Sequence, residues 1–270
     1  MVKPGLPKLI ATDLDGTLVR SDDTVSAYTH EVLDRVRAAG IRLVGATGRG
    51  PRLSELTRND IRAADFLVLA QGGWVLDRND PEPLRAARLP GSSLTDALAG
   101  LEATVGPLSV MVEALAHIDA PLWGDYDPNW RYPVRVEPLS RAECLRHDVI
   151  KAFARSFSLH VDELLAAAQR AIPADVASVT QAGLDYIEIC PPNVDKGTGL
   201  AVVAEVVGVD PADVLVFGDM PNDLPMFAWA GWSRVAVANA HASILAVADE
   251  ITLTNDEDGV AVYLDRLLSR

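Results

Sequence analysis

Acidic and polar side chains follow several short apolar segments of the 270-residue chain. The first segment, Leu9 to Ala11, leads into Asp13 and Asp15, and Gly16 then allows a sharp turn. Two carboxylates at positions i and i+2 can point to the same side of the chain, where they repel unless one is protonated or a cation lies between them. Mg²⁺, a hard ion that takes oxygen ligands, suits such a pair. A solvated turn is the alternative, because Asp and Gly favour turns.

Three more positions at the ends of expected strands carry groups that suit phosphoryl chemistry. If all four positions meet at one sheet edge, they form an acidic metal site flanked by a hydroxyl and an ammonium. Each group alone has a plainer explanation, as a helix cap, a solvated helix-start residue or a capping turn. Their joint occurrence in this order favours the phosphoryl site. The three positions hold Thr47 with Gly48 and Arg49, then Lys196, then Asp219, Asn222 and Asp223.

Alternating strand and helix patterns position these groups. Apolar runs at 9–11, 41–46 and 66–70 predict strands, and a helix capped by Ser26 or Thr24 ends near Gly40. The alternation resumes near Asp195, with a helix over about 197–207, a strand at 214–217 and further α/β pattern to the end of the chain. This order predicts an α/β core with a doubly wound parallel sheet, whose ligands lie at the carboxyl ends of the strands.

The pattern changes between the two halves of this core. Residues 71–77 predict a turn and a short hairpin, and residues 79–83 resemble a linker. The following segment predicts helices at 93–104 and 161–171 and strands at 109–115, 134–137, 149–153, 175–180 and 186–189. We therefore expect a core of residues 1–82 and 189–270 with an inserted α+β cap domain of residues 83–188.

Composition excludes several classes of function. A net charge of −14 disfavours nucleic acid and anionic membrane surfaces as partners. No apolar run is long enough for a signal peptide or a membrane span, and Cys144 and Cys190 do not suggest a disulfide framework. We expect a cytoplasmic protein, as a monomer or a homodimer. Only 4 of its 24 basic residues are Lys, so a well-placed Lys such as Lys196 can reflect a need for a compact ammonium.

The motifs together resemble the haloacid dehalogenase (HAD) superfamily, and within it the Cof-type group of sugar phosphatases with a large, late-inserted cap. The resemblance covers the whole chain and rests on D-L-D-G-T-L at 13–18, A-T-G-R at 46–49, the Lys196–Gly197 pair and G-D-M-P-N-D at 218–223. Two weaker matches lie at 236–240 and 254–260. Departures, such as Ala238 where members often have Gly, remove no catalytic group.

This resemblance implies a Rossmann-like core and distinct roles for the acids. Asp13 would be the nucleophile that forms an aspartyl-phosphate, and Asp15 the general acid and then the general base. Thr47 and Lys196 would bind the phosphoryl group, together with Gly48 and Arg49.

The resemblance also implies the metal site. Mg²⁺ would be held by the Asp13 carboxylate, the Asp15 backbone carbonyl and Asp219, with Asp223 supporting that set and Asn222 supporting the lysine or the phosphoryl group. The strands that carry Asp13 and Asp219 would be neighbours.

Substrate choice would lie in the cap, where four large aromatic residues fall within ten positions: Trp123, Tyr126, Trp130 and Tyr132. They either pack in the cap core or at a subunit contact, which we favour, or close over the active site. Arg131 and Arg135 could meet a second anionic group, although a surface position is the simpler reading.

The expected function is Mg²⁺-dependent hydrolysis of a small phosphorylated metabolite, such as a sugar phosphate or a phosphorylated cofactor. A phosphomutase of the same superfamily is an alternative, in which a sugar hydroxyl replaces water. A phospho-accepting regulatory protein is an alternative of another class, although its usual motif and length differ.

Overall fold

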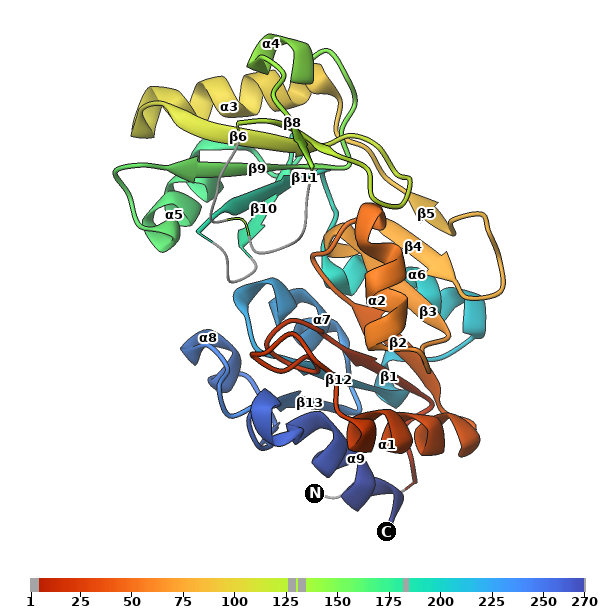
Figure 1. The fold of residues 1–270 in the computed structure, drawn as a ribbon. Helices are drawn as coiled ribbons and strands as arrows, with labels where there is room; N and C mark the ends of the chain where they lie inside the picture. Colours follow the sequence, from red (N-terminus) through yellow and green to blue (C-terminus); the bar gives the residue numbers. More distant parts are fainter. Residues whose placement is uncertain (1–4, 126–129, 131–134, 182–184, 270) are drawn as a thin grey trace.

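A computed structural model describes residues 5–125, 130, 135–181 and 185–269 of the chain, which form two stacked parts built on separate sheets (Figure 1). The lower part, the core, contains the N- and C-terminal segments. Its strands are β1 (Leu9–Thr12), β2 (Arg42–Ala46), β3 (Phe66–Leu69), β4 (Trp74–Asp77), β5 (Arg85–Ala86), β12 (Val214–Gly218), β13 (Ser233–Ala236) and β14 (Glu250–Ile251). Its helices are α1 (Ala27–Ala38), α2 (Ser54–Asp60), α6 (Lys196–Val207), α7 (Leu224–Trp229), α8 (Ala242–Leu245) and α9 (Gly259–Leu268).

The core sheet has the order β14-β13-β12-β1-β2-β3-β4-β5, and its pairs from β14 to β3 are parallel. Strand β4 pairs antiparallel with β3, and β5 pairs antiparallel with β4, so the turn expected within 71–77 connects β3 to β4 in a hairpin. The structure confirms the predicted α/β fold class, a doubly wound, Rossmann-like core with an α+β cap. Strand β1 lies at the centre of this order, so the loop after it opens at the middle of the sheet edge.

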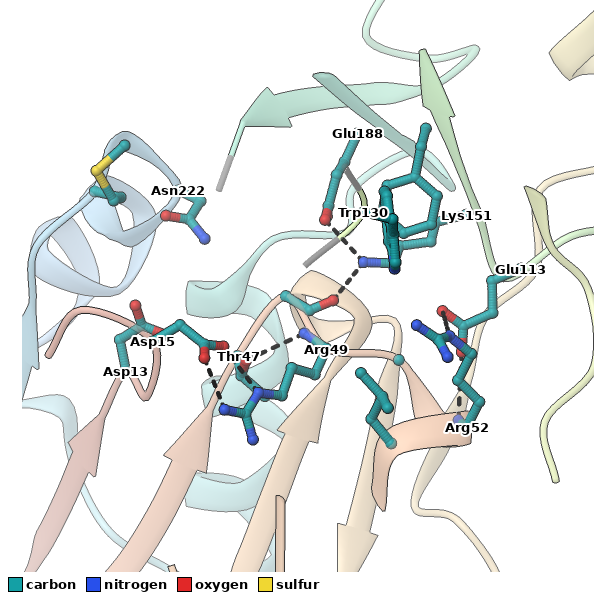
Figure 2. Close-up of a pocket in the computed structure, with 15 residues that line it drawn as sticks. Asp13, Asp15, Thr47, Arg49, Arg52, Glu113, Trp130, Lys151, Glu188 and Asn222 are labelled. Carbon is teal, nitrogen blue, oxygen red and sulfur yellow. Dashed lines mark hydrogen bonds and ion pairs between the residues drawn. The ribbon is translucent and has the colours of Figure 1, made fainter. Parts of the chain in front are cut away.

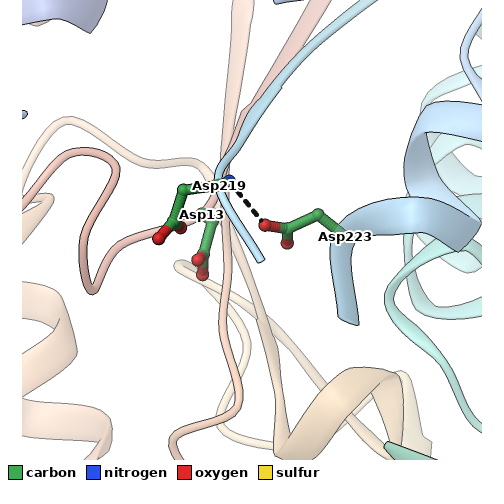
Figure 3. Close-up of side chains that lie close together, drawn as sticks. All are labelled: Asp13, Asp219 and Asp223. Carbon is green, nitrogen blue, oxygen red and sulfur yellow. Dashed lines mark hydrogen bonds between the residues drawn. The ribbon is translucent and has the colours of Figure 1, made fainter. Parts of the chain in front are cut away.

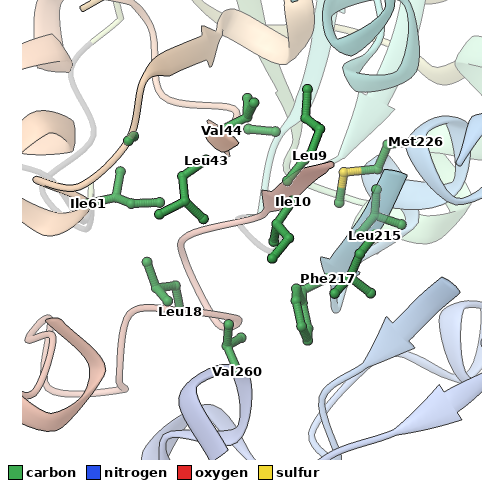
Figure 4. Close-up of a cluster of buried hydrophobic side chains, with 14 of the residues drawn as sticks. Leu9, Ile10, Leu18, Leu43, Val44, Ile61, Leu215, Phe217, Met226 and Val260 are labelled. Atoms are coloured by element: carbon green, nitrogen blue, oxygen red, sulfur yellow. The ribbon is translucent and has the colours of Figure 1, made fainter. Parts of the chain in front are cut away.

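Apolar side chains alternate between the two faces of the core sheet, as continuous apolar strands predict. Leu9 and Val44 point toward Met226 of α7, whereas Ile10 points toward the side of Leu18 and Val260 (Figure 4). Burying each such side chain stabilises the fold by about 1.5–3 kcal/mol. Both faces are covered, and the carboxyl edge is therefore the part of the sheet that is open for ligands.

The upper part, the cap, is a sheet with helices on one face (Figure 1). Among the described residues its order is β10-β11-β9-β6-β7-β8. The cap strands are β6 (Leu108–Glu113), β7 (Leu122–Gly124), β8 (Val136–Glu137), β9 (Lys151–Ser156), β10 (Ser178–Gln181) and β11 (Ile187–Cys190). The cap helices are α3 (Gly91–Val105), α4 (Arg141–Cys144) and α5 (Val161–Ala171).

Alternation along the cap strands gives the sheet two different faces. Val110 and Val112 of β6 pack in the cluster under α3 and α5, whereas Met111 joins Phe153 and Tyr186 in a second cluster on the other face. Charged residues share this second face, which looks toward the core. The cap thus presents polar groups to the carboxyl edge of the core sheet.

The strand pairings place both domain boundaries at positions that differ from those we expected. The expected cap began at residue 83, but β5 at 85–86 pairs with β4 in the core sheet. The expected core resumed at residue 189, but β11 extends to Cys190 in the cap sheet. Short edge strands and buried strands carry weak boundary signals, which explains both shifts. No helix among the described residues is long and apolar enough to span a membrane.

Candidate active site

Two neighbouring strands bring the first and last acidic motifs together. Strands β1 and β12 are parallel with Thr12 opposite Phe217, and the Asp13 N–H donates to the Phe217 carbonyl over 3.0 Å. Asp13 and Asp219 therefore follow adjacent strand ends, although more than 200 positions separate them in the sequence. This confirms the predicted neighbourhood of the two strands.

Lys196 links the acids at the floor of the site. Its fully buried Nζ lies 2.7 Å from Asp13 Oδ1 and 2.6 Å from Asp223 Oδ1. Burial alone lowers the pKa of the Lys196 ammonium, but the charges of Asp13 and Asp223 outweigh this and raise that pKa above its ordinary value. The ammonium therefore stays charged, and one of its three hydrogens is left for a ligand oxygen.

Three carboxylate side chains, those of Asp13, Asp219 and Asp223, lie close together at the floor (Figure 3). Oxygens of Asp13, Asp219 and Asp223 all lie within 4.8 Å of one another. Burial, with a contribution from the Asp223 charge, raises the pKa of Asp13 well above its ordinary value and that of Asp219 to about 6. Such hard, crowded and partly repelling oxygens fit a divalent cation such as Mg²⁺.

The chain leaves room for these carboxylates at Gly16. This residue has φ +85°, and a Cβ here would lie 2.6 Å from Asp219 Oδ2. Thr17 donates its hydroxyl to Asp219 Oδ1 over 2.7 Å, which orients the carboxylate. The glycine of the D-x-D-G motif therefore serves both the turn and the close approach of Asp219.

Asp223 supports the site through hydrogen bonds. Its Oδ2 accepts the backbone N–H groups of Asp219 and Met220 at 2.9 and 3.0 Å, while its Oδ1 is on Lys196. Both oxygens are thus committed within the protein. Asp223 consequently holds the lysine and the Asp219 loop in place.

Asp15 and Arg49 form a two-pronged ion pair. The Arg49 Nε and Nη2 donate to the two oxygens of Asp15 over 2.8 and 2.7 Å, and its Nη1 donates to Asp60 over 2.5 Å (Figure 2). Arg49 was expected among the phosphate-binding residues. Its guanidinium orients Asp15 in this structure, and the side chain also lines the pocket above the floor.

Thr47 and Asn222 approach the pocket from the two sides of Asp13. The Thr47 Oγ1 accepts the Arg49 N–H over 3.1 Å, so its hydroxyl hydrogen can be donated to a ligand. The Asn222 Nδ2 donates to Gln71 over 3.2 Å, and Lys196 is not among its partners. Gly48 contributes its carbonyl, which accepts a hydrogen bond from the cap residue Lys151.

Residues of the cap form the opposite wall of this pocket (Figure 2). Glu113 and Lys151 lie opposite each other on β6 and β9, and Phe153 lies opposite Glu188 on β11. The Lys151 ammonium donates to the Glu188 carboxylate over 2.8 Å, and Gln71 of the core donates to the other Glu188 oxygen, also over 2.8 Å. Buried charged side chains thus join the cap to the core around the pocket.

The motif search missed this cap wall and its core contacts. The missed residues are Gly50, Arg52, Gln71, Glu113, Lys151 and Glu188. A weak signal exists, since Glu113, Lys151 and Glu188 are each the single charge in the strands predicted at 109–115, 149–153 and 186–189. Lys151 is also one of only four lysines. Gln71 carries no such signal, because its role depends on a turn with positive φ at Ala70 and Gln71.

The two described aromatic residues of the cap cluster have different environments. Trp123 packs against the helix-facing cap core and donates its indole N–H to Glu137 over 3.1 Å, as the favoured packing interpretation predicts. Trp130 packs against Phe153 and Tyr186 in the second cap cluster, as the same interpretation predicts, and it also lines the pocket. Arg135 is 70% exposed and paired with Glu137, while Tyr126, Arg131 and Tyr132 lie outside the described residues.

Comparison with known proteins gives consistent matches. A family model for haloacid dehalogenase-like hydrolases matches residues 10–264. The 5-amino-6-(5-phospho-D-ribitylamino)uracil phosphatase YwtE of Bacillus subtilis is 28% identical over 293 residues, which covers 97% of this chain and 98% of that protein. The Escherichia coli phosphatase YbjI, named for the same substrate, is 28% identical over 274 residues and covers 97% and 96%.

Solved structures show the same architecture. A sugar phosphatase described as HAD subclass IIB superposes with a TM-score of 0.79 at 21% identity, covering 96% of this chain and 98% of its own. At this identity the match shows a shared fold, including the place of the cap.

Proposed function

The chain belongs to the haloacid dehalogenase-like hydrolases, and on this premise we propose that it is a Mg²⁺-dependent phosphatase of small phosphorylated metabolites that forms an aspartyl-phosphate. Membership confirms the family and the enzyme class predicted from the sequence, a phosphoric monoester hydrolase. The observation that carries the proposal is the position of Asp13 at the pocket floor, 2.7 Å from Lys196, with Asp15 lining the same pocket.

Asp13 is the nucleophile in this proposal. One of its carboxylate oxygens attacks phosphorus, and the bond from phosphorus to the leaving-group oxygen breaks. The remaining hydrogen of Lys196 and the hydroxyl of Thr47 donate to phosphoryl oxygens, where negative charge gathers. Full burial of Lys196 strengthens this attraction, because little water screens it.

Asp15 moves the proton in both half-reactions. It first protonates the departing alkoxide, and then accepts a proton from the water that attacks phosphorus and releases inorganic phosphate from Asp13. Both of its oxygens accept hydrogen bonds from Arg49 in this structure, and these bonds orient the carboxyl group for both transfers. Arg49 and Asp60 act as positioning residues for it.

The acidic floor is the proposed cation site. Asp13, Asp219 and the Asp15 backbone carbonyl would hold Mg²⁺, which supplies positive charge beside the phosphoryl oxygens when bound. Two observations support this site: the carboxylate oxygens are crowded, and the pKa values of Asp13 and Asp219 are raised. A bound cation would reduce the repulsion between the carboxylates and lower both pKa values.

The proposed substrate class rests on a pocket lined by both core and cap and on the relatives. The matched curated phosphatases are named for a phosphorylated ribitylaminouracil, and a matched structure for sugar phosphates. A small phosphorylated metabolite with a polar leaving group suits a pocket lined by both core and cap. We propose a cytoplasmic location. Cys144 and Cys190 are free, buried thiols, and such thiols are compatible with the reducing conditions of the cytoplasm.

Release of phosphate from an aryl phosphate tests this function. We expect turnover that requires Mg²⁺ and that falls by at least about 10⁴-fold in Asp13→Asn. The control is Asp34→Asn, an exposed acid on α1, which should retain full activity. Full activity in Asp13→Asn, or isomerisation of a hexose phosphate without phosphate release, would contradict the proposal.

A further inference from the structure

Four buried polar atoms of pocket-lining residues make no hydrogen bond in the described part of the chain. One of them, Arg52 Nε, forms an ion pair with Glu113, and the other three are Glu113 Oε2, Trp130 Nε1 and Asn222 Oδ1. Buried polar atoms are rarely left without a partner in native proteins. Glu113 and Asn222 are only 1% and 5% exposed, so bulk water does not satisfy them. Their common position at one pocket indicates that a ligand completes them.

Neighbouring groups hold these atoms in place without satisfying them. Glu113 Oε1 accepts the Arg52 backbone N–H over 3.3 Å, while Arg52 Nε lies 4.0 Å from Glu113 Oε2, beyond hydrogen-bond distance. The Trp130 ring stands edge-on between Phe153, at 4.8 Å between centroids, and Tyr186, at 5.4 Å. These contacts orient the unsatisfied acceptor of Glu113 and the unsatisfied donor of Trp130 at the pocket wall (Figure 2).

The charges around this wall disfavour a second anion. Each described cation that lines the pocket already has an acidic partner: Arg49 has Asp15 and Asp60, Arg52 has Glu113, and Lys151 has Glu188. An additional carboxylate or phosphate would lie near Glu113 and Glu188, and the described cations that it could meet there, Arg52 and Lys151, are already paired with these two acids. A neutral or cationic leaving group meets no such penalty.

We propose that the leaving group accepted under the cap carries N–H or O–H donors and no second negative charge, with a donor bound by Glu113 Oε2 and an acceptor bound by Trp130 Nε1. Asn222 Oδ1 takes a further donor closer to the phosphoryl group. This inference rests on the proposed phosphatase function and specifies its substrates as hydroxylated or amino-bearing esters. Glu113 and Trp130 are then its specificity-determining residues.

Matched pairs of esters test the charge requirement. Sorbitol 6-phosphate and 6-phosphogluconate differ at one end, where a CH₂OH group replaces a carboxylate. We expect kcat/KM of the wild-type enzyme to be at least about tenfold higher for the neutral ester, since an unpaired anion beside Glu113 is disfavoured. Equal or faster turnover of 6-phosphogluconate would overturn the inference.

Variants test the two residues. Trp130→Phe keeps the ring and removes the N–H, and Glu113→Gln keeps the shape and removes the charge. We expect Trp130→Phe to lower kcat/KM for sorbitol 6-phosphate relative to 4-nitrophenyl phosphate by about tenfold. Glu113→Gln should reduce the preference for sorbitol 6-phosphate over 6-phosphogluconate. Trp123→Phe, which removes an indole N–H bonded within the cap at Glu137, is the matched control and should leave both ratios unchanged.

The outcomes separate this inference from the proposed function. No hydrolysis of either 4-nitrophenyl phosphate or the metabolite esters with Mg²⁺ would overturn both. Hydrolysis with equal losses on sorbitol and aryl esters in Trp130→Phe, or an unchanged preference in Glu113→Gln, would overturn the assignment of these residues alone. Thermal melting of each variant shows whether it retains the fold.

Discussion

The acidic floor and the cap wall of the pocket differ in how far their polar groups are satisfied within the protein. At the floor, Lys196 binds Asp13 and Asp223, and Thr17 binds Asp219. At the cap wall, Glu113 Oε2 and Trp130 Nε1 have no hydrogen-bond partner within the described residues. We infer from this difference that the two regions have separate roles. The core orients the groups that act on the phosphoryl group, and the cap keeps hydrogen-bonding atoms for the leaving group.

Among the changes that compare the floor with the cap wall, removing the floor cation should give the largest effect. Lys196→Met leaves Asp13 and Asp223 buried without their ammonium, so the free energy of unfolding should fall by about 3 kcal/mol. The same change should lower kcat by about 10³-fold, because a charge beside the phosphoryl group is lost. Denaturant unfolding and steady-state kinetics measure these effects.

Lys8→Met is the matched control for that variant. Its ammonium is 67% exposed and lies 2.7 Å from Asp213, a distance similar to those of Lys196. We expect no measurable change in stability or activity, since water screens this pair. Similar losses in both lysine variants would contradict the importance given to burial at the floor.

Binding of Mg²⁺ should weaken as the pH falls through about 6. Burial raises the pKa of Asp219 to about 6, so below that pH a proton competes with the cation, while above it the carboxylate is free. The apparent Kd for Mg²⁺ should therefore be about tenfold higher at pH 5 than at pH 7.5. Titration calorimetry of the chelator-treated protein measures it, and a pH-independent Kd would argue against Asp219 as a ligand.

Crowding the cap wall should have an intermediate effect. Gly50 has φ −83°, which any residue adopts, but a Cβ here would lie 2.1 Å from both Glu113 oxygens. Gly50→Ala must displace Glu113, so kcat/KM for a polyol phosphate should fall by about tenfold. Gly100→Ala on α3 is the control, since its nearest contact is 3.8 Å away. Unchanged kinetics in Gly50→Ala would mean that Glu113 does not contact the substrate.

The smallest effect is expected at Arg135 of the cap. Its guanidinium is 70% exposed and 3.0 Å from Glu137, and it is not among the described residues that line the pocket. Arg135→Ala should change kcat/KM by less than about twofold, because exposed pairs contribute little. A selective loss of activity on a bisphosphate would instead show that Arg135 binds a second anion.

The floor could be predicted from the sequence because its residues directly follow strands whose parallel order brings their ends together. Asp13, Thr47 and Asp219 each come at or just after the end of an apolar run, and the register of β1 with β12 follows from the α/β pattern. Residues that directly follow these parallel strands must therefore lie at the same edge of the sheet. The pairing of Asp15 with Arg49 is a side-chain geometry that this reasoning did not provide.

The cap wall could not be predicted in the same way. Glu113, Lys151 and Glu188 come from three antiparallel strands whose register depends on long connections between them. A single charge in a short apolar strand is also expected where the strand lies at a solvent-exposed edge of a sheet. Only the packing of α3 and α5 on the other face shows that these charges look toward the core.

Trapping the phosphoenzyme tests the central claim most directly. Borohydride reduces an acyl phosphate to an alcohol, so quenching turnover with borohydride should convert the phosphorylated aspartate into homoserine. We expect peptide mapping to find homoserine at position 13, in larger yield in Asp15→Asn, where hydrolysis of the intermediate is slowed, and none at this position in Asp13→Asn. Reduction at another residue, or undiminished hydrolysis by Asp13→Asn, would contradict the account.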